Sequence, residues 1–383
     1  MSMSRTAWLA CMLSIISILT TQLKKSTQKA SVSIFVLFIC LMATAISFYQ
    51  LKKESADGRL FIWKITYSIV KEHSLFGIAI GNFPGFYGEA QEEYFREGKG
   101  NEYEKMLAGA PDTAYNEYLQ IWVETGIFGL MLYLGLLFFT YKNLIHLRVN
   151  EVVGLHGSLV CLMVFSFFSY PFRCYSTCIL SVLILTWAVL TPFIFTKCVR
   201  PTYQLFALAI IPYIYITTSY ILHETPTTKQ AIKQWDMIRP FFEREQYAKV
   251  VSYYRKLYPF LKHKAGFLFE YGQCLSHTHQ YNKSNNILAE GMNISSDPMF
   301  LNLIGKNYQR LGLYQEAENM YCKAYYRIPH RMYPLFLLMN LYEKEKDTAR
   351  MQEMANQIIE MEEKIPSSLT RYIKNEAIKK LHK

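Results

Sequence analysis

The chain has 383 residues, of which 51% are hydrophobic and 15% aromatic, and its formal net charge is +11. Long apolar runs fill residues 1–222, whereas residues 223–383 are polar and rich in tyrosine. Lysine and arginine are spread among glutamates with no basic run that stands alone, so nucleic acid is excluded as an expected partner.

Six apolar runs predict membrane-spanning helices, because about 18 or more apolar residues suffice to cross a bilayer. The first run is short enough for a signal peptide, but no small-residue cleavage site follows it, which favours a helix. The predicted spans are residues 6–21, 31–51, 117–141, 152–169, 177–196 and 203–222.

Basic residues cluster in three of the short loops between these runs, which the positive-inside rule places in the cytoplasm. The N-terminus, the long loop 52–116 and everything after residue 222 then lie on the opposite side. The clustered residues are Lys24, Lys25 and Lys29, then Lys142 and Arg148, then Lys197 and Arg200.

The long loop 52–116 contains an amphipathic run that ends near Lys71, and a glycine-containing segment follows it. Gly77 and Gly81 are not followed by the Lys-Ser/Thr pair of a phosphate-binding loop. We therefore expect these glycines to serve tight packing.

The loop turns into the third predicted span at residues 112–129. Polar groups at a membrane boundary are costly, and this turn carries Tyr115 and Asn116. Asp112 and Glu117 are candidates for acid–base work, although acidic residues also favour helix N-termini for electrostatic reasons. Glu124, further along, is expected to bond to a neighbouring helix.

Two arginines, Arg5 and Arg59, fall on the same predicted side of the membrane as this turn. A guanidinium binds phosphate through two parallel hydrogen bonds, although a single arginine at a membrane surface also serves to reach the headgroups. Two arginines and a polar helix start on one side favour a diphosphate site.

The cysteines give no disulfide framework, although Cys174 and Cys178 could pair across one helical turn. The chain has no Cys/His cluster with metal-ligand spacing and no Asp-x-Asp pair. We therefore expect neither a metal nor a cofactor.

A repeat of ~34 residues follows residue 222, which is the tetratricopeptide period. It is marked by Gln246-Tyr247, Gln280-Tyr281, Leu313-Tyr314 and Asp347-Thr348. The clearest unit resembles a tetratricopeptide repeat through Gly305, Tyr308, Gly312, Tyr314, Ala317, Ala324 and Pro329. This resemblance implies a helical solenoid with a concave face that binds protein partners.

Four motifs recur in a fixed order through the apolar half of the chain. They are Ser4-Arg5-x3-Leu9, Gly58-Arg59-x3-Trp63, Leu75-Phe76-Gly77-x3-Gly81-x-Phe83 and Asn116-x9-Gly126-x2-Gly129. With these motifs, residues 4–195 resemble the C-terminal half of the O-antigen ligase and polymerase family, polytopic glycosyltransferases that use undecaprenyl-diphosphate-linked glycans. The resemblance implies that Arg5 and Arg59 hold the lipid diphosphate.

One position departs from the family pattern, because a histidine is expected where this chain has Tyr115. A histidine can accept a proton near neutral pH, whereas a tyrosine is a poor base but can donate to a phosphate. The catalytic candidates are therefore Tyr115, Asn116, Asp112 and Glu117. The family also has more spans, so this chain would be an N-terminally truncated copy.

We accordingly expect an all-α protein in two domains. Residues 1–222 form a polytopic membrane bundle of about six spans, and residues 223–383 form a soluble tetratricopeptide-type solenoid. The expected function is metal-independent, inverting glycan transfer from undecaprenyl diphosphate to an acceptor hydroxyl at the bacterial inner membrane, with the long loop and tail in the periplasm. Ligation to a lipid core, polymerisation of glycan units and transfer to protein remain open.

The alternative, from another class, is a non-enzymatic membrane-anchored scaffold. In that interpretation, the tetratricopeptide region recruits envelope proteins and the spans only anchor it. The tyrosine at position 115 favours the scaffold, whereas the retention of Arg5, Arg59 and Asn116 favours the enzyme.

Overall fold

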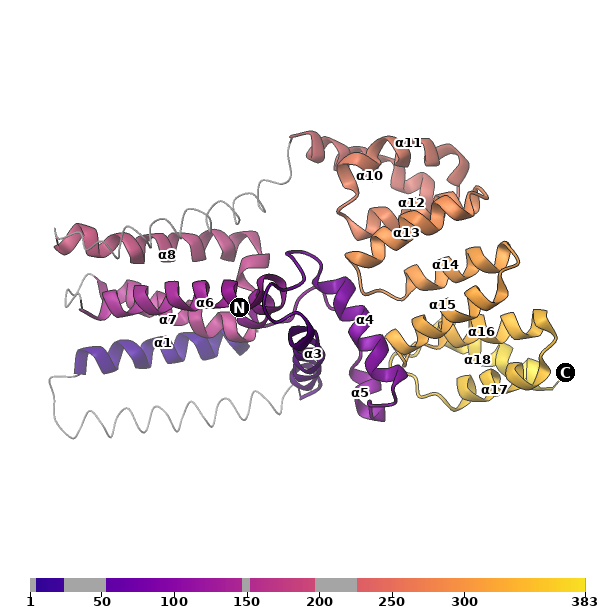
Figure 1. Cartoon of the computed structure of the whole chain (residues 1–383), viewed down its shortest axis with the longest axis horizontal. Coiled ribbons are helices and arrows are strands. Elements are labelled where there is room, and N and C mark those ends of the chain that lie inside the picture. Colours follow the sequence, from indigo (N-terminus) through magenta and orange to yellow (C-terminus); the bar gives the residue numbers. More distant parts are fainter. Residues whose placement is uncertain (1–4, 24–52, 147–151, 197–225, 383) are drawn as a thin grey trace. The chain divides into compact units, whose positions relative to one another are not determined.

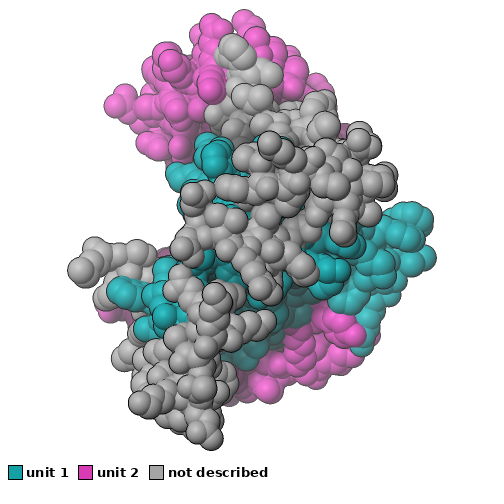
Figure 2. Space-filling model, turned by 90° about the vertical axis from the view of Figure 1, so that its left-hand side faces the viewer, with its two compact units in different colours: residues 1–63, 70–79, 113–223 teal, residues 64–69, 80–112, 224–383 magenta. Residues whose placement is uncertain are grey.

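The computed structural model describes residues 5–23, 53–146, 152–196 and 226–382, and all regular structure in this part is helical (Figure 1). The chain divides into two compact units (Figure 2). Unit 1 comprises residues 1–63, 70–79 and 113–223, and unit 2 comprises residues 64–69, 80–112 and 224–383. Much of the long loop 52–116 therefore clusters with the C-terminal region.

Unit 1 is built around four apolar helices that lie side by side (Figure 1). α1 packs against α7, and α6, α7 and α8 pack on one another around a core that includes Leu137, Leu159 and Leu185. The helices are α1 (Arg5–Leu23), α6 (Glu117–His146), α7 (Val153–Phe168) and α8 (Tyr175–Thr196), and the short 3-10 helix η2 (Pro171–Arg173) precedes α8.

Within the described residues, one helix is long and apolar enough to cross a membrane, over Glu117–Lys142 of α6. The shorter apolar segments Thr6–Leu19, Val153–Phe168 and Tyr175–Leu190 coincide with three other predicted spans. The predicted spans 31–51 and 203–222 lie outside the described residues.

The backbone of α6 is interrupted at Gly126, which has a φ of 71° and a ψ of −173°. Here the backbone N–H of Ile127 donates to the Ser74 carbonyl at 2.9 Å, and that of Ile78 donates to the Val123 carbonyl at 2.9 Å. The segment before α4 thus bonds to α6 on both sides of the interruption. This segment thereby pairs backbone groups that α6 leaves unpaired at the interruption.

Two glycines permit this contact. A Cβ on Gly77 would lie 2.5 Å from the Glu124 carbonyl carbon, and a Cβ on Gly126 would lie 2.0 Å from the Leu75 carbonyl oxygen. Both glycines also have positive φ angles, which L side chains rarely adopt. The structure confirms the expected packing role of Gly77, whereas the expectation is wrong for Gly81, where a Cβ would meet nothing within 4 Å.

The C-terminal helices of unit 2 pack in sequence, each against the next (Figure 1). We call them the repeat region. They are α10 (Pro226–Glu243), α11 (Tyr247–Leu261), α12 (Ala265–His277), α13 (Tyr281–Asn293), α14 (Met299–Arg310), α15 (Tyr314–Arg327), α16 (Met332–Glu345), α17 (Thr348–Glu360) and α18 (Ser368–Leu381).

The ~34-residue period of the sequence marks the start of every second helix, at the first residues of α11, α13, α15 and α17. A residue with positive φ stands two positions before each of these starts and makes the turn between paired helices. The four turn residues are Glu245, His279, Gly312 and Lys346. Only one of them is a glycine, so the turn was not evident from composition.

Small residues let paired helices approach closely. A Cβ on Gly272 would lie 2.5 Å from the Leu288 side chain, and one on Gly305 would lie 2.4 Å from the Tyr321 ring. In both cases the neighbour is a side chain of the next helix.

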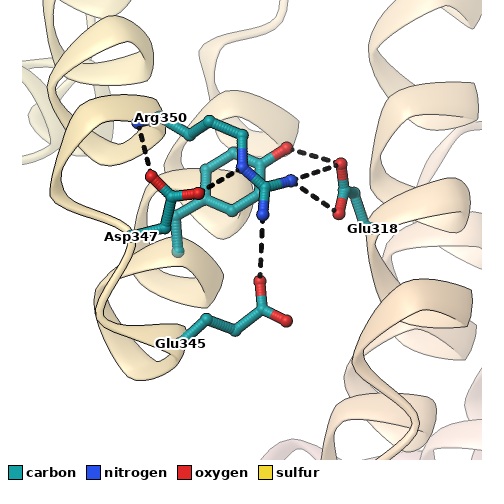
Figure 3. A network of polar contacts seen from close by, with 5 residues as sticks. Glu318, Glu345, Asp347 and Arg350 are labelled. Atoms are coloured by element: carbon teal, nitrogen blue, oxygen red, sulfur yellow. Dashed lines mark hydrogen bonds and ion pairs between the residues drawn. The ribbon is translucent and has the colours of Figure 1, made fainter.

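A polar network joins α15, α16 and α17 near their ends (Figure 3). Arg350 donates to both Glu318 carboxylate oxygens at 3.1 Å and to Asp347 at 2.6 Å, and Glu345 lies 3.9 Å away. The Arg350 guanidinium also lies 4.3 Å from the centre of the Tyr342 ring.

Two helices from the long loop, α4 (Phe83–Arg96) and α5 (Glu102–Leu107), complete unit 2. α4 packs against α13 and α15, and a Cβ on Gly85 would lie 2.3 Å from the Asn293 carbonyl oxygen. At the centre, Arg327 is 1% exposed and lies 3.3 Å from the carboxylate of Glu92, while Gln91 donates to the Arg327 carbonyl.

Candidate functional site at the start of α6

Asn116 is the residue immediately before α6 and caps the helix. Its side-chain oxygen accepts from the backbone N–H of Leu119 at 3.1 Å, and the side chain is 7% exposed. The preceding residue, Tyr115, has a φ of 52°, so the chain turns sharply into the helix. An asparagine cap satisfies a backbone donor at the helix start. By capping the helix, Asn116 fixes the backbone next to Tyr115 and so helps to position its side chain.

Arg59 and Tyr115 are in contact. The Arg59 guanidinium, on α3 (Lys53–Glu72), lies 5.4 Å from the centre of the Tyr115 ring, and its Nη1 donates to the Phe168 carbonyl at 2.7 Å. Tyr170 packs edge-on against Tyr115 with ring centres 5.2 Å apart. The arginine is therefore held by a cation–π contact and by the end of α7.

Trp63 lies one helical turn after Arg59 and fixes the same loop. Its indole N–H donates to the Ala114 carbonyl at 2.8 Å, and Phe167 packs edge-on against its ring at 5.7 Å. Trp63 of the Gly58-Arg59-x3-Trp63 motif thus hydrogen-bonds to the residue that precedes Tyr115. The motif spacing was the signal that could have identified Trp63 as part of the site.

A chain of hydrogen bonds runs inward from Ala114. The Ala114 N–H donates to Gln120 Oε1 at 2.7 Å, Gln120 Nε2 donates to Glu124 Oε1 at 2.9 Å, and Arg173 Nη2 pairs with Glu124 Oε1 at 2.6 Å. The prediction that Glu124 bonds to a neighbouring helix is confirmed, and the partner lies on η2. Sequence reasoning missed Gln120 and Arg173. An arginine in the short loop between two apolar runs was the available signal.

The other predicted residues take separate positions. Glu117 is 4% exposed; the Phe172 backbone N–H bonds to its carboxylate, and its Oε2 has no hydrogen-bond partner among the described residues. Asp112 is exposed. Arg5 begins α1, but its side chain lies outside the described part of the chain.

The described residues contain no group of His, Cys, Asp or Glu side chains that could hold a metal ion. Cys174 and Cys178, the pair considered for a disulfide, are both free. The chemistry visible at the site is that of one fixed guanidinium, a phenol, and two buried carboxylates, one of them ion-paired.

Arg59 and Tyr115 are in contact at the capped start of α6, and both lie in a segment of the chain that matches a known protein family. Residues 1–134 match the O-antigen ligase family. The match includes both arginines, Tyr115, Asn116 and the Gly77–Gly126 contact, and it indicates ligation or polymerisation of a lipid-linked glycan. No curated protein matches the chain.

Proposed function

We propose that the protein transfers a glycan from an undecaprenyl-diphosphate carrier to an acceptor hydroxyl, as a multi-pass protein of the bacterial inner membrane. The observation that carries this proposal is the fixed contact between Arg59 and Tyr115 inside the segment that matches the O-antigen ligase family. The long loop and the repeat region, of tetratricopeptide type, would lie in the periplasm. The acceptor is a lipid core, a growing glycan or a protein.

In the proposed reaction, the acceptor oxygen attacks the anomeric carbon and the bond from that carbon to the diphosphate oxygen breaks, with inversion. The electron pair leaves with the diphosphate, whose negative charge Arg59 and Arg5 stabilise. Preorganised cations aimed at developing charge provide a large share of catalysis in such sites. Because Arg59 is already held by Phe168 and Tyr115, little reorganisation is needed.

The acceptor proton needs a base, and Tyr115 is a poor one at neutral pH. We assign Tyr115 to hydrogen bonding with a diphosphate oxygen. The candidates to take the proton are Asp112, which is exposed, and Glu117, which is buried and has one oxygen without a partner among the described residues. Asn116 positions Tyr115 by capping the helix.

The decisive experiment replaces Arg59 in the full-length protein and measures consumption of undecaprenyl-diphosphate-linked glycan in membranes. Arg59→Gln is expected to lower transfer about 100-fold or more, as loss of a transition-state donor does. Arg59→Lys keeps the positive charge but not the two parallel N–H donors of the guanidinium, and should recover only part of the rate. Arg255→Gln, an exposed site on α11, is the matched control. Full activity of Arg59→Gln at normal protein level would remove Arg59 from the mechanism.

A second comparison addresses Tyr115. Tyr115→Phe keeps the ring that contacts Arg59 but removes the hydroxyl, so its activity isolates the hydrogen bond to phosphate. Tyr115→His restores the residue typical of the family. If Tyr115→Phe transfers as fast as the parent chain, the hydroxyl has no role in the reaction.

The non-enzymatic scaffold is the second candidate. Two observations favour it: Tyr115 replaces the family's histidine, and the Arg59 guanidinium and the Tyr115 ring are both engaged in packing contacts. In that case Arg59→Gln would lower protein stability without any change in glycan transfer in the cell.

A further inference from the structure

The segment 74–80, between α3 and α4, exposes large apolar side chains. Leu75 is 56% exposed, Phe76 is 79% exposed and Ile80 is 49% exposed. None of the residues in this segment is charged. Exposed apolar side chains that gather in one place mark a surface that another apolar phase covers.

The exposed side chains of this segment are continuous with an exposed apolar stripe on α6. The ring centres of Phe76 and Phe128 lie 6.0 Å apart. Phe128 begins the stripe, which continues on the same face of the helix with Met131, Leu132 and Phe139. Because α6 carries the segment that is long and apolar enough to cross a membrane, this stripe is the surface that would face lipid.

The interruption at Gly126 puts the contact near the start of the membrane-crossing part of α6. Along a straight helix, Tyr118 and Tyr133 would be separated by about 22 Å. Their ring centres lie 5.7 Å apart, so the two parts of α6 fold toward each other at Gly126. The part from there to His146 is about 30 Å long, which matches the hydrocarbon thickness of a bilayer. Phe128 lies in the first turn of that part.

The backbone of the segment is prepared for an apolar environment. The Ser74 carbonyl and the Ile78 N–H each bond to the backbone of α6 at 2.9 Å, and the Gly77 N–H donates to the carbonyl four residues earlier at 3.0 Å. A backbone group that enters hydrocarbon needs a partner in the protein, because lipid chains offer none. The interruption of α6 supplies two such partners.

We propose that the segment 74–80 inserts into the bilayer beside the start of the membrane-crossing part of α6, where phospholipid acyl chains cover Leu75, Phe76 and Ile80. The topology expected from the sequence places all of the loop 52–116 outside the membrane, whereas this proposal puts its apolar tip in lipid. Bilayer lipid is the occupant because the exposed side chains continue the lipid-facing stripe of α6. The inference rests on the proposed membrane location and is independent of glycan transfer.

The test introduces an environment-sensitive fluorescent amino acid at single positions of the full-length protein in phosphatidylcholine nanodiscs. It replaces Phe76 in one form and Leu75 in another, so that a folding failure of one form leaves the other. Phosphatidylcholine with a nitroxide on its acyl chain should quench both strongly, and aqueous iodide should quench both weakly. The lipid-facing control is Leu132 on α6, and the water-facing control is Tyr103 on α5, which should show the opposite pattern.

The controls separate failure of the inference from failure of the proposed membrane location. Lipid quenching at Leu132 but at neither Phe76 nor Leu75 would overturn the inference alone. Absence of lipid quenching at all three positions would overturn the membrane location with it. Shielding of Phe76 from both quenchers would mean that protein covers the segment, and relief of lipid quenching by undecaprenyl phosphate would mean that the isoprenoid chain of the carrier covers it. Either result would also overturn the inference.

Discussion

In unit 1, Gly77 and Gly126 allow two backbone segments to touch, whereas in unit 2 Gly272 and Gly305 each make room for one side chain of the next helix. The first contact joins backbone atoms far apart in sequence, which cannot move aside without breaking hydrogen bonds. The second recurs with the repeat, and the neighbouring side chain can shift to another position. The same residue type therefore meets different demands at the break in α6 and within the repeat helices, and Gly85 of unit 2, against the Asn293 carbonyl, belongs with the first kind.

The largest effect is expected for Gly126→Ala. A Cβ there would lie 2.0 Å from the Leu75 carbonyl oxygen, at a φ of 71°. The free energy of unfolding of unit 1 should fall by more than about 4 kcal/mol, at the extreme of single substitutions. Resistance to unfolding by SDS in mixed micelles measures it. Gly135→Ala, on the same helix with open space around it, should be neutral or slightly stabilising, by up to about 1 kcal/mol. A similar effect of both variants would show that the backbone contact is not what holds the loop.

The next effect is expected for the buried ion pair of unit 2. Arg327→Met leaves the buried Glu92 carboxylate with only the exposed Arg96, at 3.8 Å, and should cost about 3–4 kcal/mol of unfolding free energy. The double variant Arg327→Met with Glu92→Met should recover much of this loss, which a double-mutant cycle on chemical unfolding measures. Equal stability of the single and double variants would mean that Glu92 is solvated in the folded protein.

The pH dependence of Arg327→Met follows from Glu92. Burial raises the pKa of Glu92, and Arg327 opposes that shift. Without Arg327 the pKa rises further, so the folded state holds a proton that the unfolded state releases. The variant should therefore be most stable relative to the parent chain below the ordinary glutamate pKa, and should lose stability as pH rises through the raised value. Unfolding midpoints from pH 4 to pH 8, measured for both proteins, test the sign.

A smaller effect is expected for Gly305→Ala, whose Cβ would lie 2.4 Å from the Tyr321 ring. The ring can shift, so the expected cost is about 1–3 kcal/mol. Adding Tyr321→Leu should remove the clash and make the two changes non-additive. Gly266→Ala, whose nearest neighbour is Trp235 at 3.7 Å, is the control. A loss as large as that of Gly126→Ala would abolish the distinction between the break in α6 and the repeat helices.

The smallest effect is expected for Arg350→Gln. The side chains of the network in Figure 3 are partly exposed, and solvent and salt weaken such ion pairs. The thermal midpoint should change less than for any variant above, and the difference should shrink further in high salt. A change that persists in high salt would indicate that stacking on Tyr342 matters more than charge.

Sequence reasoning predicted the all-helical class, because periodic apolar runs and a 34-residue repeat depend only on local order. The structure adds that the residues marking this period, Tyr247, Tyr281, Tyr314 and Thr348, are the first residues of the second helix in each pair. Sequence reasoning missed the interruption of α6 at Gly126, because the pattern of apolar residues is the same for a continuous helix and for one with a non-helical residue inside it. It placed Trp63 in a motif without its contact to Ala114, and it missed Gln120 and Arg173, which meet at Glu124.

Spacing and side-chain chemistry alone predict the apolar runs, the repeat period, the ligase-like motifs and the residues that could meet phosphate, although not the helices α4 and α5 of the long loop. Folding brings Arg59 to Tyr115 and Glu124 to Arg173, and it packs part of the long loop with the repeats around Arg327 and Glu92. Spacing along the chain cannot predict these contacts, because they depend on which surfaces approach one another. Gly77 and Gly126 show this, because neither shows its role until the other's backbone lies against it.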